Sequence, residues 1–453
     1  MSNFMNYNII HIGAESCVTG SCHLLQVKDI NIMIDCGLAS GDDPVLSFDE
    51  WPVKPADIDY LFLTHAHIDH IGRVPELIEN GFEGEILCTS PTKEIIMPML
   101  ADAMGFSDRL DRENKKIQAV IDELSWGFEY NKEFSLKRGI KFKFKNAGHI
   151  LGSSFIRFSS VHPEWSVTFS GDIGADNTPI LPAPDTPEPS DLLIMESTYG
   201  DRNHGDRTER ISRLGNILSR ALSDGGKVFI PAFSLGRVQE LIYEMDRLFS
   251  DAELSDKYPA LKKYGKLPVF IDSPLGLEIT RIYSGLSDYW DEEACRIKFS
   301  GDHPIDFNHL YAVGKYPEHL KLVDYDKPAV IIAGSGMCSG GRIVDHIENG
   351  IENSANDILF AGYQAKGTLG RKIKKYSKRS NGYVYINGRK KVIRADVHGL
   401  AGYSAHADQK GLVQWVEKMP ERPGKIKLVH GEGKSMHALS LILENLGYQV
   451  EYC

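Results

Sequence analysis

Residues 59–77 read DYLFLTHAHIDHIGRVPEL, an apolar segment that runs into a dense group of polar side chains. The pattern predicts a strand that sends Leu61 and Leu63 into a core and then gives way to a loop. That loop carries three imidazoles and a carboxylate, on His65, His67, Asp69 and His70. Imidazole nitrogen and carboxylate oxygen suit Zn²⁺ or Mn²⁺ where thiolates are absent. We therefore expect a metal site directly after this strand.

Further donors are expected at other strand ends, because four ligands cannot complete two metal sites. His149 follows the segment KFKFKNAG, residues 141–148, and precedes a glycine-rich turn. Asp172 ends the segment SVTFSG, and His430 ends the segment KIKLV. Singly, each is a common type of loop residue. Together they favour a metal site, because each lies just past an apolar strand, where a rigid scaffold places functional groups.

The chain changes its pattern twice. Its first part shows short strands broken by glycine and polar turns, with helix expected over about 91–124. From about Asp201 an apolar strand, a glycine-containing turn and an amphipathic helix alternate, which predicts a parallel sheet flanked by helices. After about Ile386 short strands return, and a last helix is expected over 435–446. The middle therefore looks like an insertion, and the Pro-rich stretch 179–189 reads as an extended surface connection.

The composition is that of a soluble globular protein. The 453 residues include 51 Lys and Arg against 62 Asp and Glu, so the net charge is −11, and the length predicts two or three domains. No apolar run approaches the ~20 residues of a membrane-spanning helix, and the first residues lack the pattern of a signal peptide. The seven cysteines form no CxxC pair, which favours reduced thiols. We therefore expect a cytoplasmic protein.

One basic tract interrupts this acidic chain. Residues 358–395 contain no Asp or Glu, and their many basic side chains include Lys366, Arg371, Lys372 and Lys375. Tyr376, Tyr383 and Tyr385 lie among the basic residues. Cations for phosphates and aromatic faces for bases are the mixture that a single-stranded nucleic-acid groove uses. The alternative is a solvated helix followed by a basic hairpin over residues 383–392.

The whole pattern resembles the β-CASP ribonuclease family of the metallo-β-lactamase fold. Eight segments besides the histidine-rich loop match family signatures in the family's order: GAESCVTGSCHLL (13–25), MIDCG (33–37), ESTYG (196–200), IPAFSLGRVQE (230–240), FIDSPL (270–275), GSGMCSGGR (334–342), YSAHAD (403–408) and LVHGE (428–432). The resemblance implies an α/β fold, with an αββα metallo-β-lactamase sandwich from residues 1–198 and 386–453. It implies an inserted parallel-sheet β-CASP domain over residues 199–385, and single-stranded RNA in the cleft between the two.

The resemblance also assigns the metal ligands, carried over residue by residue. One metal falls to His65, His67 and His149, the other to Asp69, His70 and His430, and Asp172 bridges the two. Two Zn²⁺ ions are expected, with Mn²⁺ as an alternative. Asp35 matches the carboxylate that orients the ligands, since ligating histidines need their other N–H fixed.

The same family pattern assigns the catalytic residues. Glu196 and His406 match a pair that positions a general acid, because a carboxylate beside an imidazole raises its pKa and selects one tautomer. Asp69 is the third catalytic residue. A histidine at position 430 resembles the pattern of the RNA-processing members of the family, whereas the DNA-processing members carry an apolar residue at this position.

The expected reaction is the hydrolysis of phosphodiester bonds in single-stranded RNA. Two metals activate a hydroxide that attacks the phosphorus in line, and His406 protonates the leaving oxygen to give 3′-hydroxyl and 5′-phosphate ends. Internal cleavage is favoured over 5′-exonuclease action. Two alternatives stay open: a hydrolase of a small thioester or lactam, and a non-catalytic RNA-binding scaffold. A homodimer through the terminal segment YQVEYC is a further expectation.

The segment GSGMCSGG follows an apolar strand and resembles a dinucleotide-binding turn. We exclude NAD binding, because the acidic residue about twenty positions further on, Asp357, starts a strand where the motif needs it at a strand end. A cradle for an RNA phosphate is the better interpretation, with Ser335, Gly336, Ser339 and Arg342 as candidates, although a plain helix-start loop is nearly as good. Arg237, at another strand-to-helix turn, is a further anion-binding candidate.

Overall fold

The structure, a computed structural model, describes residues 7–41, 43–105, 111–205, 207, 209–258, 261, 267–400 and 402–453. It divides into two compact units. The sandwich unit comprises residues 1–176, 181–203 and 405–453, and the insertion unit comprises residues 177–180 and 204–404. Within the described ranges, no helix is long and apolar enough to cross a membrane.

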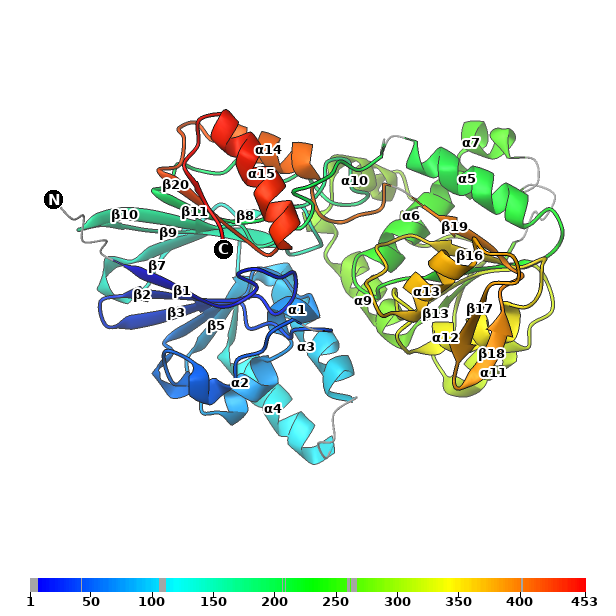
Figure 1. Cartoon of the computed structure of the whole chain (residues 1–453), viewed down its shortest axis with the longest axis horizontal. Coiled ribbons are helices and arrows are strands. Elements are labelled where there is room, and N and C mark those ends of the chain that lie inside the picture. Colours follow the sequence, from blue (N-terminus) through cyan, green and yellow to red (C-terminus); the bar gives the residue numbers. More distant parts are fainter. Residues whose placement is uncertain are drawn as a thin grey trace. The chain divides into compact units, whose positions relative to one another are not determined.

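Two mixed sheets form the sandwich unit (Figure 1). The first has the order β1-β2-β3-β4-β5-β6, with β1 (Asn8–Gly13), β2 (Cys22–Val27), β3 (Ile30–Ile34), β4 (Tyr60–Phe62), β5 (Glu85–Thr89) and β6 (Ser125–Phe128). The second has the order β21-β20-β11-β10-β9-β8-β7, with β7 (Glu133–Ser135), β8 (Lys141–Asn146), β9 (Ser154–Val161), β10 (Glu164–Phe169), β11 (Leu192–Glu196), β20 (Lys425–Val429) and β21 (Val450–Glu451). Since β20 pairs in parallel with β11, both ends of the chain complete one domain.

Helices cover the outer faces of the two sheets (Figure 1). Beside the first sheet lie α1 (Ile68–Ile71), α2 (Val74–Glu79), α3 (Ser90–Gly105) and α4 (Asp111–Leu124), and beside the second lie α14 (Gln409–Glu417) and α15 (Gly433–Asn445). Between the sheets the core is aromatic: the Phe62 ring lies edge-on to Phe142 and Phe158, with centroids 4.9 and 4.8 Å apart. Behind the second sheet, Trp415 of α14 packs against Phe155 of β9. These layers confirm the predicted αββα sandwich.

Strand β4 is buried on both of its faces. Leu61 and Leu63 are buried as predicted, but Tyr60 and Phe62 are buried as well and belong to the core between the sheets. A sheet that is covered by helices on one side and by a second sheet on the other leaves no polar face. The alternation expected of a half-buried strand is therefore absent, and polar residues begin only at Thr64, where the strand has ended.

The insertion unit is built on a six-stranded sheet with the order β14-β13-β15-β12-β16-β19, all of whose pairs are parallel. Its strands are β12 (Lys227–Pro231), β13 (Val269–Asp272), β14 (Leu310–Ala312), β15 (Ala329–Ala333), β16 (Asp357–Phe360) and β19 (Asp396–Gly399). Its helices are α5 (Arg210–Ala221), α6 (Arg237–Ser250), α7 (Ala252–Lys257), α9 (Pro274–Gly285), α10 (Glu292–Phe299), α11 (Tyr316–Val323), α12 (Arg342–Gly350) and α13 (Leu369–Tyr376). The predicted strand–turn–helix alternation is confirmed, and a hairpin of β17 (Tyr383–Ile386) and β18 (Arg389–Val392) follows α13.

Several boundaries differ from the sequence-based expectation. The insertion unit comprises residues 177–180 and 204–404, whereas 199–385 was expected, and it ends later because β19 pairs with β16 and so extends the parallel sheet. The helix expected over 91–124 is two helices, α3 and α4, and the residues between them lie outside the described ranges. The Pro-rich stretch 179–189 has no regular structure, yet Ile180 and Leu181 are buried, so it is only partly a surface connection. Strand β21 lies at a sheet edge, and its pairing in a homodimer stays a prediction.

Candidate metal centre

The predicted metal ligands of the sandwich unit all follow strand ends or lie in the short helix α1. His65 comes three residues after β4, His67 is the N-cap of α1, and Asp69 and His70 lie within α1. Three further strands place the remaining ligands: His149 follows β8, Asp172 follows β10 and His430 follows β20. Four strand ends from distant parts of the sequence therefore supply one centre.

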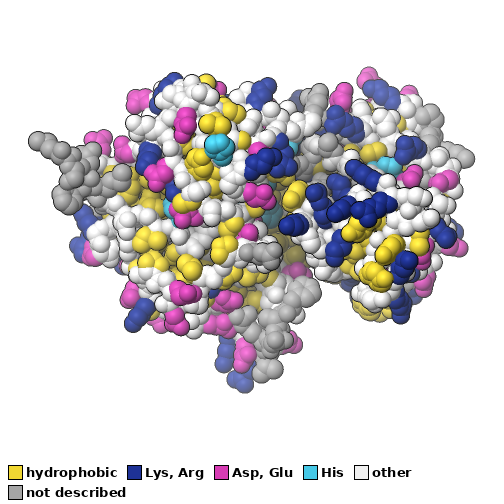
Figure 2. All heavy atoms as spheres, viewed as in Figure 1, with side chains coloured by type: hydrophobic (Ala, Val, Ile, Leu, Met, Phe, Trp, Pro, Cys, Tyr) yellow, Lys and Arg dark blue, Asp and Glu magenta, His cyan; other side chains and the backbone are white. Residues whose placement is uncertain are grey.

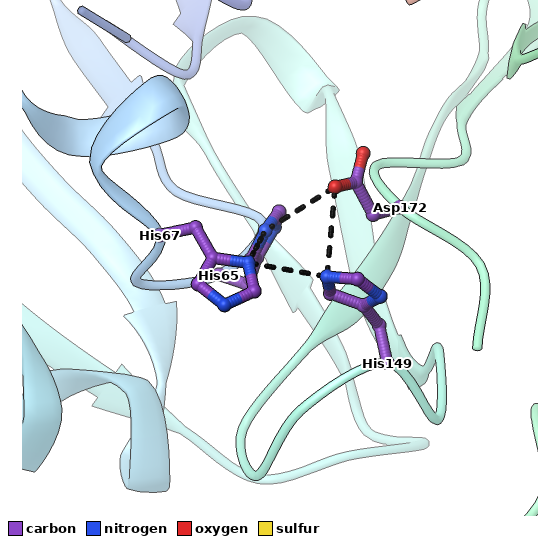
Figure 3. Close-up of side chains that lie close together, drawn as sticks. All are labelled: His65, His67, His149 and Asp172. Atoms are coloured by element: carbon purple, nitrogen blue, oxygen red, sulfur yellow. Dashed lines mark hydrogen bonds and ion pairs between the residues drawn. The ribbon is translucent and has the colours of Figure 1, made fainter. Parts of the chain in front are cut away.

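The first cluster joins three histidines and Asp172 (Figure 3). His67 Nδ1 lies 3.1 Å from His65 Nε2 and 3.1 Å from His149 Nε2. Asp172 Oδ2 lies 3.5 Å from His65 Nε2 and 3.6 Å from His149 Nε2. Ligand atoms held about 2.0–2.1 Å from a tetrahedral Zn²⁺ lie roughly 3.3 Å from one another. The spacing of the four atoms therefore fits one zinc ion.

The second cluster joins Asp69, His70 and His430. His430 Nε2 lies 3.9 Å from Asp69 Oδ2, and His430 Nδ1 lies 3.6 Å from Asp172 Oδ1. His70 Nε2 lies 3.4 Å from Asp172 Oδ2. Asp172 thus reaches both clusters, which is the position expected of a bridging ligand.

The unpaired polar atoms of the centre also fit metal ions. His70 Nε2, Asp172 Oδ1 and His430 Nε2 are buried and have no hydrogen-bond partner within the described part of the chain. Buried polar groups without partners are costly, so several of them converging on one place point to a cation site. The donor set of imidazole nitrogens and carboxylate oxygens is the one that Zn²⁺ binds.

The protonation states of the side chains in the first cluster favour metal binding. Burial lowers the pKa of His65 and His149 well below the ordinary value, and it lowers the pKa of His67 to about 4. Burial alone would raise the pKa of Asp172, but the neighbouring His430 and His70 hold that pKa well below its usual range. Neutral imidazoles and an ionised carboxylate are the forms that coordinate a metal.

Asp35 fixes the orientation of one predicted ligand. Asp35 follows β3, and its own backbone has a positive φ of 60°. Asp35 Oδ1 accepts the backbone N–H of Thr64 at 2.8 Å, and Oδ2 accepts the Thr64 hydroxyl at 2.9 Å. His70 Nδ1 donates to the same Oδ2 at 2.7 Å, which leaves His70 Nε2 free to face Asp172. The geometry is that of a carboxylate orienting a ligand histidine.

We expect the substitution Asp35→Asn to weaken zinc binding about 10–100-fold, because the amide lacks the charge that keeps His70 in the right tautomer. Competition with a chromogenic chelator measures the zinc affinity. Asp29→Asn is the matched control, since Asp29 pairs on the surface with Arg138. Equal zinc affinity of Asp35→Asn and Asp29→Asn would show that Asp35 does not support the metal centre.

Glu196 and His406 meet beside the first cluster. His406 Nδ1 lies 3.2 Å from Glu196 Oε1, and His406 Nε2 lies 3.8 Å from Asp172 Oδ2. Glu196 is held in place, because its Oε1 accepts the backbone N–H of Ile173 at 2.6 Å. Burial alone would lower the pKa of His406, but the charges of Glu196 and Asp172 outweigh it and raise that pKa to about 9. The imidazole is therefore held with Nδ1 on Glu196 and Nε2 toward Asp172.

The insertion unit uses two predicted anion-binding residues in internal contacts. Arg342 Nη1 donates to Asp272 Oδ1 at 2.7 Å and to the Val313 carbonyl at 2.8 Å, so its guanidinium ties α12 to neighbouring strand ends. Arg237 forms an ion pair with Glu240 one turn along α6. Both guanidinium groups therefore have partners within the insertion unit. Their role as RNA-phosphate ligands stays a prediction.

The glycine-rich loop after β15 is held by one hydrogen bond within it and by another from Gln364. Ser335 Oγ accepts the backbone N–H of Ser339 at 3.0 Å, and the Gly336 carbonyl accepts Gln364 Nε2 at 2.8 Å. By contrast, Lys366, Arg371, Lys372 and Lys375 are all exposed, on the segment after β16 and on α13. Their role in RNA binding stays a prediction.

Sequence reasoning missed a buried cluster in the insertion unit and two supporting hydroxyls in the sandwich unit. Asp272 Oδ2 lies 2.6 Å from both His319 Nδ1 and His346 Nε2, although neither histidine has a recognisable ligand spacing. Arg342 binds the other oxygen of Asp272, so the cluster is already neutralised and links β13, α11 and α12. The two hydroxyls belong to Thr64, which binds Asp35, and to Thr198, which lies 3.1 Å from His430 Nδ1.

Three segments of the chain match known protein families. Residues 16–198 match the metallo-beta-lactamase superfamily, residues 238–373 match the Beta-Casp domain, and residues 391–453 match the Zn-dependent metallo-hydrolase RNA specificity domain. Together with the histidine-rich centre, these matches define a zinc-dependent metallo-hydrolase of the metallo-β-lactamase superfamily. Ribonuclease TTHA0252 of Thermus thermophilus is 32% identical over 442 residues, which cover 98% of this chain and 97% of that protein. The chain belongs to the β-CASP ribonuclease family of this superfamily.

Two further proteins are similar to this chain. Transcription termination factor FttA of Methanocaldococcus jannaschii is 31% identical over 433 residues, which cover 93% of this chain and 66% of that factor. A crystal structure of a protein of unknown function from Enterococcus faecalis V583 superimposes with a TM-score of 0.58 at 13% identity, covering 99% of this chain and 97% of that one. The second likeness concerns the fold alone.

Proposed function

We propose that the protein is a zinc-dependent ribonuclease that hydrolyses phosphodiester bonds of single-stranded RNA and leaves 3′-hydroxyl and 5′-phosphate ends. The observation that carries the proposal is the pair of side-chain clusters that share Asp172. Ribonuclease TTHA0252, which matches nearly the whole chain, supports RNA as the substrate. The match of residues 391–453 to an RNA specificity domain supports the same choice.

Two zinc ions fit the centre in the following way. One would be held by His65, His67 and His149 and the other by Asp69, His70 and His430, and Asp172 would be available to both. Bound zinc supplies Lewis-acid stabilisation of phosphate charge and makes water nucleophilic near neutral pH. Asp69, on the first turn of α1, is partly exposed, as His67 is, and so lies where water reaches the centre. We therefore place it among the catalytic residues as well.

His406 holds and delivers a proton in the proposed reaction. Its Nδ1–H is directed to Glu196, so the ring presents Nε2 toward the centre. The proton at Nε2 passes to the 3′ oxygen as the P–O bond breaks, which makes the departing group a neutral hydroxyl. Glu196 keeps the ring in this orientation because backbone N–H groups of Ile173 and Thr198 fix its carboxylate.

The basic tract provides the proposed contacts to the RNA backbone. Figure 2 shows Lys and Arg side chains gathered on the insertion unit. On α13, Ile373 is buried, whereas Lys372 and Lys375 are exposed. On the hairpin, the Lys390 ammonium lies 4.2 Å from the Tyr383 ring centroid, so cations and aromatic faces share one exposed surface. This surface supplies charge for phosphates and rings for bases.

Reversing two of these charges, Lys372→Glu with Lys375→Glu, should weaken RNA binding about tenfold at low salt. The decrease should be similar for different RNA sequences, because phosphate contacts carry no sequence information. The slope of log affinity against log salt should fall by about 0.7 for each phosphate that the variant no longer neutralises. Fluorescence anisotropy over a salt series measures both quantities.

The matched control is the pair Lys115→Glu with Lys116→Glu, which changes the net charge equally at two exposed positions of α4. That pair should leave both affinity and salt slope nearly unchanged. Equal effects of the two double variants would mean that net charge alone matters, and the basic tract would then be a solvated surface.

Two other functions make different demands on the molecule. A hydrolase of a small thioester or lactam uses the same metal ligands but has no need of an exposed basic surface. A non-catalytic RNA-binding scaffold has no need of the Glu196 and His406 pair. We therefore expect RNA cleavage that stops when a chelator removes zinc and resumes when zinc is restored, with no turnover of a thioester or a β-lactam. Metal-dependent turnover of the small substrates alone would contradict the proposal.

A further inference from the structure

Two aromatic side chains are exposed at the carboxyl ends of neighbouring strands in the insertion unit. Phe233 follows β12 and is 43% exposed, and Tyr363 follows β16 and is 50% exposed. The strands themselves are buried, and β12 and β16 pair directly in the sheet. A single exposed aromatic residue needs no explanation, but two at one sheet edge, beside basic residues, indicate a binding surface.

The Phe233 ring is held by the backbone of the glycine-rich loop. A Cβ atom added at Gly336 would lie 2.7 Å from Phe233 Cδ2, so the ring packs directly against this glycine. Any side chain at position 336 would push the ring out of place. The ring is therefore supported by a rigid backbone and still leaves a large part of its surface to solvent.

Gln364 connects this loop to the segment that carries Tyr363. The Gln364 side chain is buried, and its Nε2 donates to the Gly336 carbonyl at 2.8 Å and to the Tyr363 carbonyl at 3.0 Å. A second link is the hydrogen bond of 3.2 Å from the Gly370 backbone N–H, at the start of α13, to the Met337 carbonyl. Three loops, after β12, β15 and β16, are thus fixed against one another, and two of them present an aromatic ring.

Charge around this edge favours an anionic ligand. Lys366 and Arg371 are exposed on the segment that follows Tyr363, and residues 358–395 contain no acidic side chain. A protein partner could bury the two rings, but it would also need acidic side chains placed opposite Lys366 and Arg371. Single-stranded RNA offers phosphates and flat bases at regular spacing, and proteins bind it by stacking bases on aromatic rings beside a basic groove.

We propose that Phe233 and Tyr363 are stacking platforms for bases of single-stranded RNA, with Lys366 and Arg371 contacting the adjacent phosphates. The inference rests on the proposed function and adds to it two residues that determine how the substrate is held. Because every base has an aromatic face, the surface selects for unpaired bases and tolerates most sequences. Paired RNA, whose bases are stacked on one another, binds more weakly to it.

The test compares an intact oligouridine of about 12 nucleotides with the same chain lacking its bases, both bound at equilibrium. A His406→Ala background blocks cleavage during the measurement. Phe233→Leu keeps the apolar contact with Gly336 but removes the aromatic face, and Phe233→Tyr keeps both. The matched control is Phe299→Leu, because Phe299 lies in the same unit and is 89% exposed.

We expect Phe233→Leu to bind the intact oligomer about tenfold more weakly and the baseless oligomer as well as the parent does. Phe233→Tyr and Phe299→Leu should bind both as the parent does, and Tyr363→Leu should behave as Phe233→Leu does. Unchanged binding of the intact oligomer by Phe233→Leu would overturn the inference, as would equal weakening for both oligomers, which would assign the ring a purely structural role.

Cleavage of the same oligouridine by the unsubstituted protein reports separately on the proposed function. Base-dependent binding without any cleavage would overturn the ribonuclease proposal and would still support stacking by Phe233. Cleavage combined with binding that ignores Phe233 would leave the ribonuclease proposal standing and overturn this inference alone.

Discussion

Replacing Asp172 with alanine will remove bound zinc and RNA cleavage together. Asp172 Oδ2 lies within 3.4–3.6 Å of nitrogens of His65, His70 and His149, and Oδ1 lies 3.6 Å from His430 Nδ1. Without this carboxylate, both clusters lose a ligand and the negative charge that neutralises two cations. Metal ions supply several kcal/mol of transition-state stabilisation, and about 1.4 kcal/mol is worth a tenfold change in rate. We therefore expect activity to fall by about 10³-fold or more.

Zinc per chain, measured by mass spectrometry of the metal, and the rate of RNA cleavage give the two readouts. Asp176→Ala is the matched control, because Asp176 is an exposed carboxylate four residues further along the chain. Circular dichroism establishes that both variants are folded. An Asp172→Ala protein that retains its full zinc content would contradict the assignment of Asp172 as the shared ligand.

The second large effect is expected at His406, where alanine should leave zinc bound and stop the chemical step. His406 is outside the two ligand clusters and lies with Glu196 and Asp172 in a neighbouring group, and its Nδ1 is directed to Glu196. Removal of a general acid costs about 10²–10⁴-fold in rate. The value of kcat should fall by this factor, whereas KM and the zinc content should change little.

The control for this variant is His437→Ala, since His437 is an exposed histidine on α15. Glu196→Gln should reproduce part of the effect, because the amide still accepts a hydrogen bond from His406 but carries no charge to hold the proton. A His406→Ala protein without zinc would instead make His406 a metal ligand and would overturn the proposed division of roles.

The fold was largely predictable because its signals are local. The alternation of apolar strand, glycine turn and amphipathic helix over the middle of the chain predicted the parallel sheet, and its register confirms it. The end of the insertion was harder to place. Residues 386–404 contain short strands like those of the sandwich unit, and only the pairing of β19 with β16 assigns them to the insertion. Strand pairing over long sequence separation leaves no mark on composition.

In the candidate site, too, residues with local sequence signals were predictable and contacts between distant residues were not. His65, His67, Asp69 and His70 were found from their spacing within one loop, and the other ligands were found because each follows an apolar strand. The partners that orient them were harder to predict, because the contacts of Thr64 with Asp35 and of Thr198 with His430 join residues far apart in sequence. The contact of Arg342 with Asp272 could not be predicted for the same reason, since Asp272 lies 70 residues away.

The decisive measurement is the cleavage of one single-stranded RNA, labelled separately at its 5′ and 3′ ends, by the zinc-loaded protein and by Asp172→Ala. We predict internal fragments with 3′-hydroxyl and 5′-phosphate ends from the unsubstituted protein, and none from the variant. Release of mononucleotides from the 5′ end alone would keep the zinc chemistry but replace internal cleavage with exonuclease action. An RNA left intact by a protein with both zinc ions bound would contradict the conclusion that this centre hydrolyses RNA.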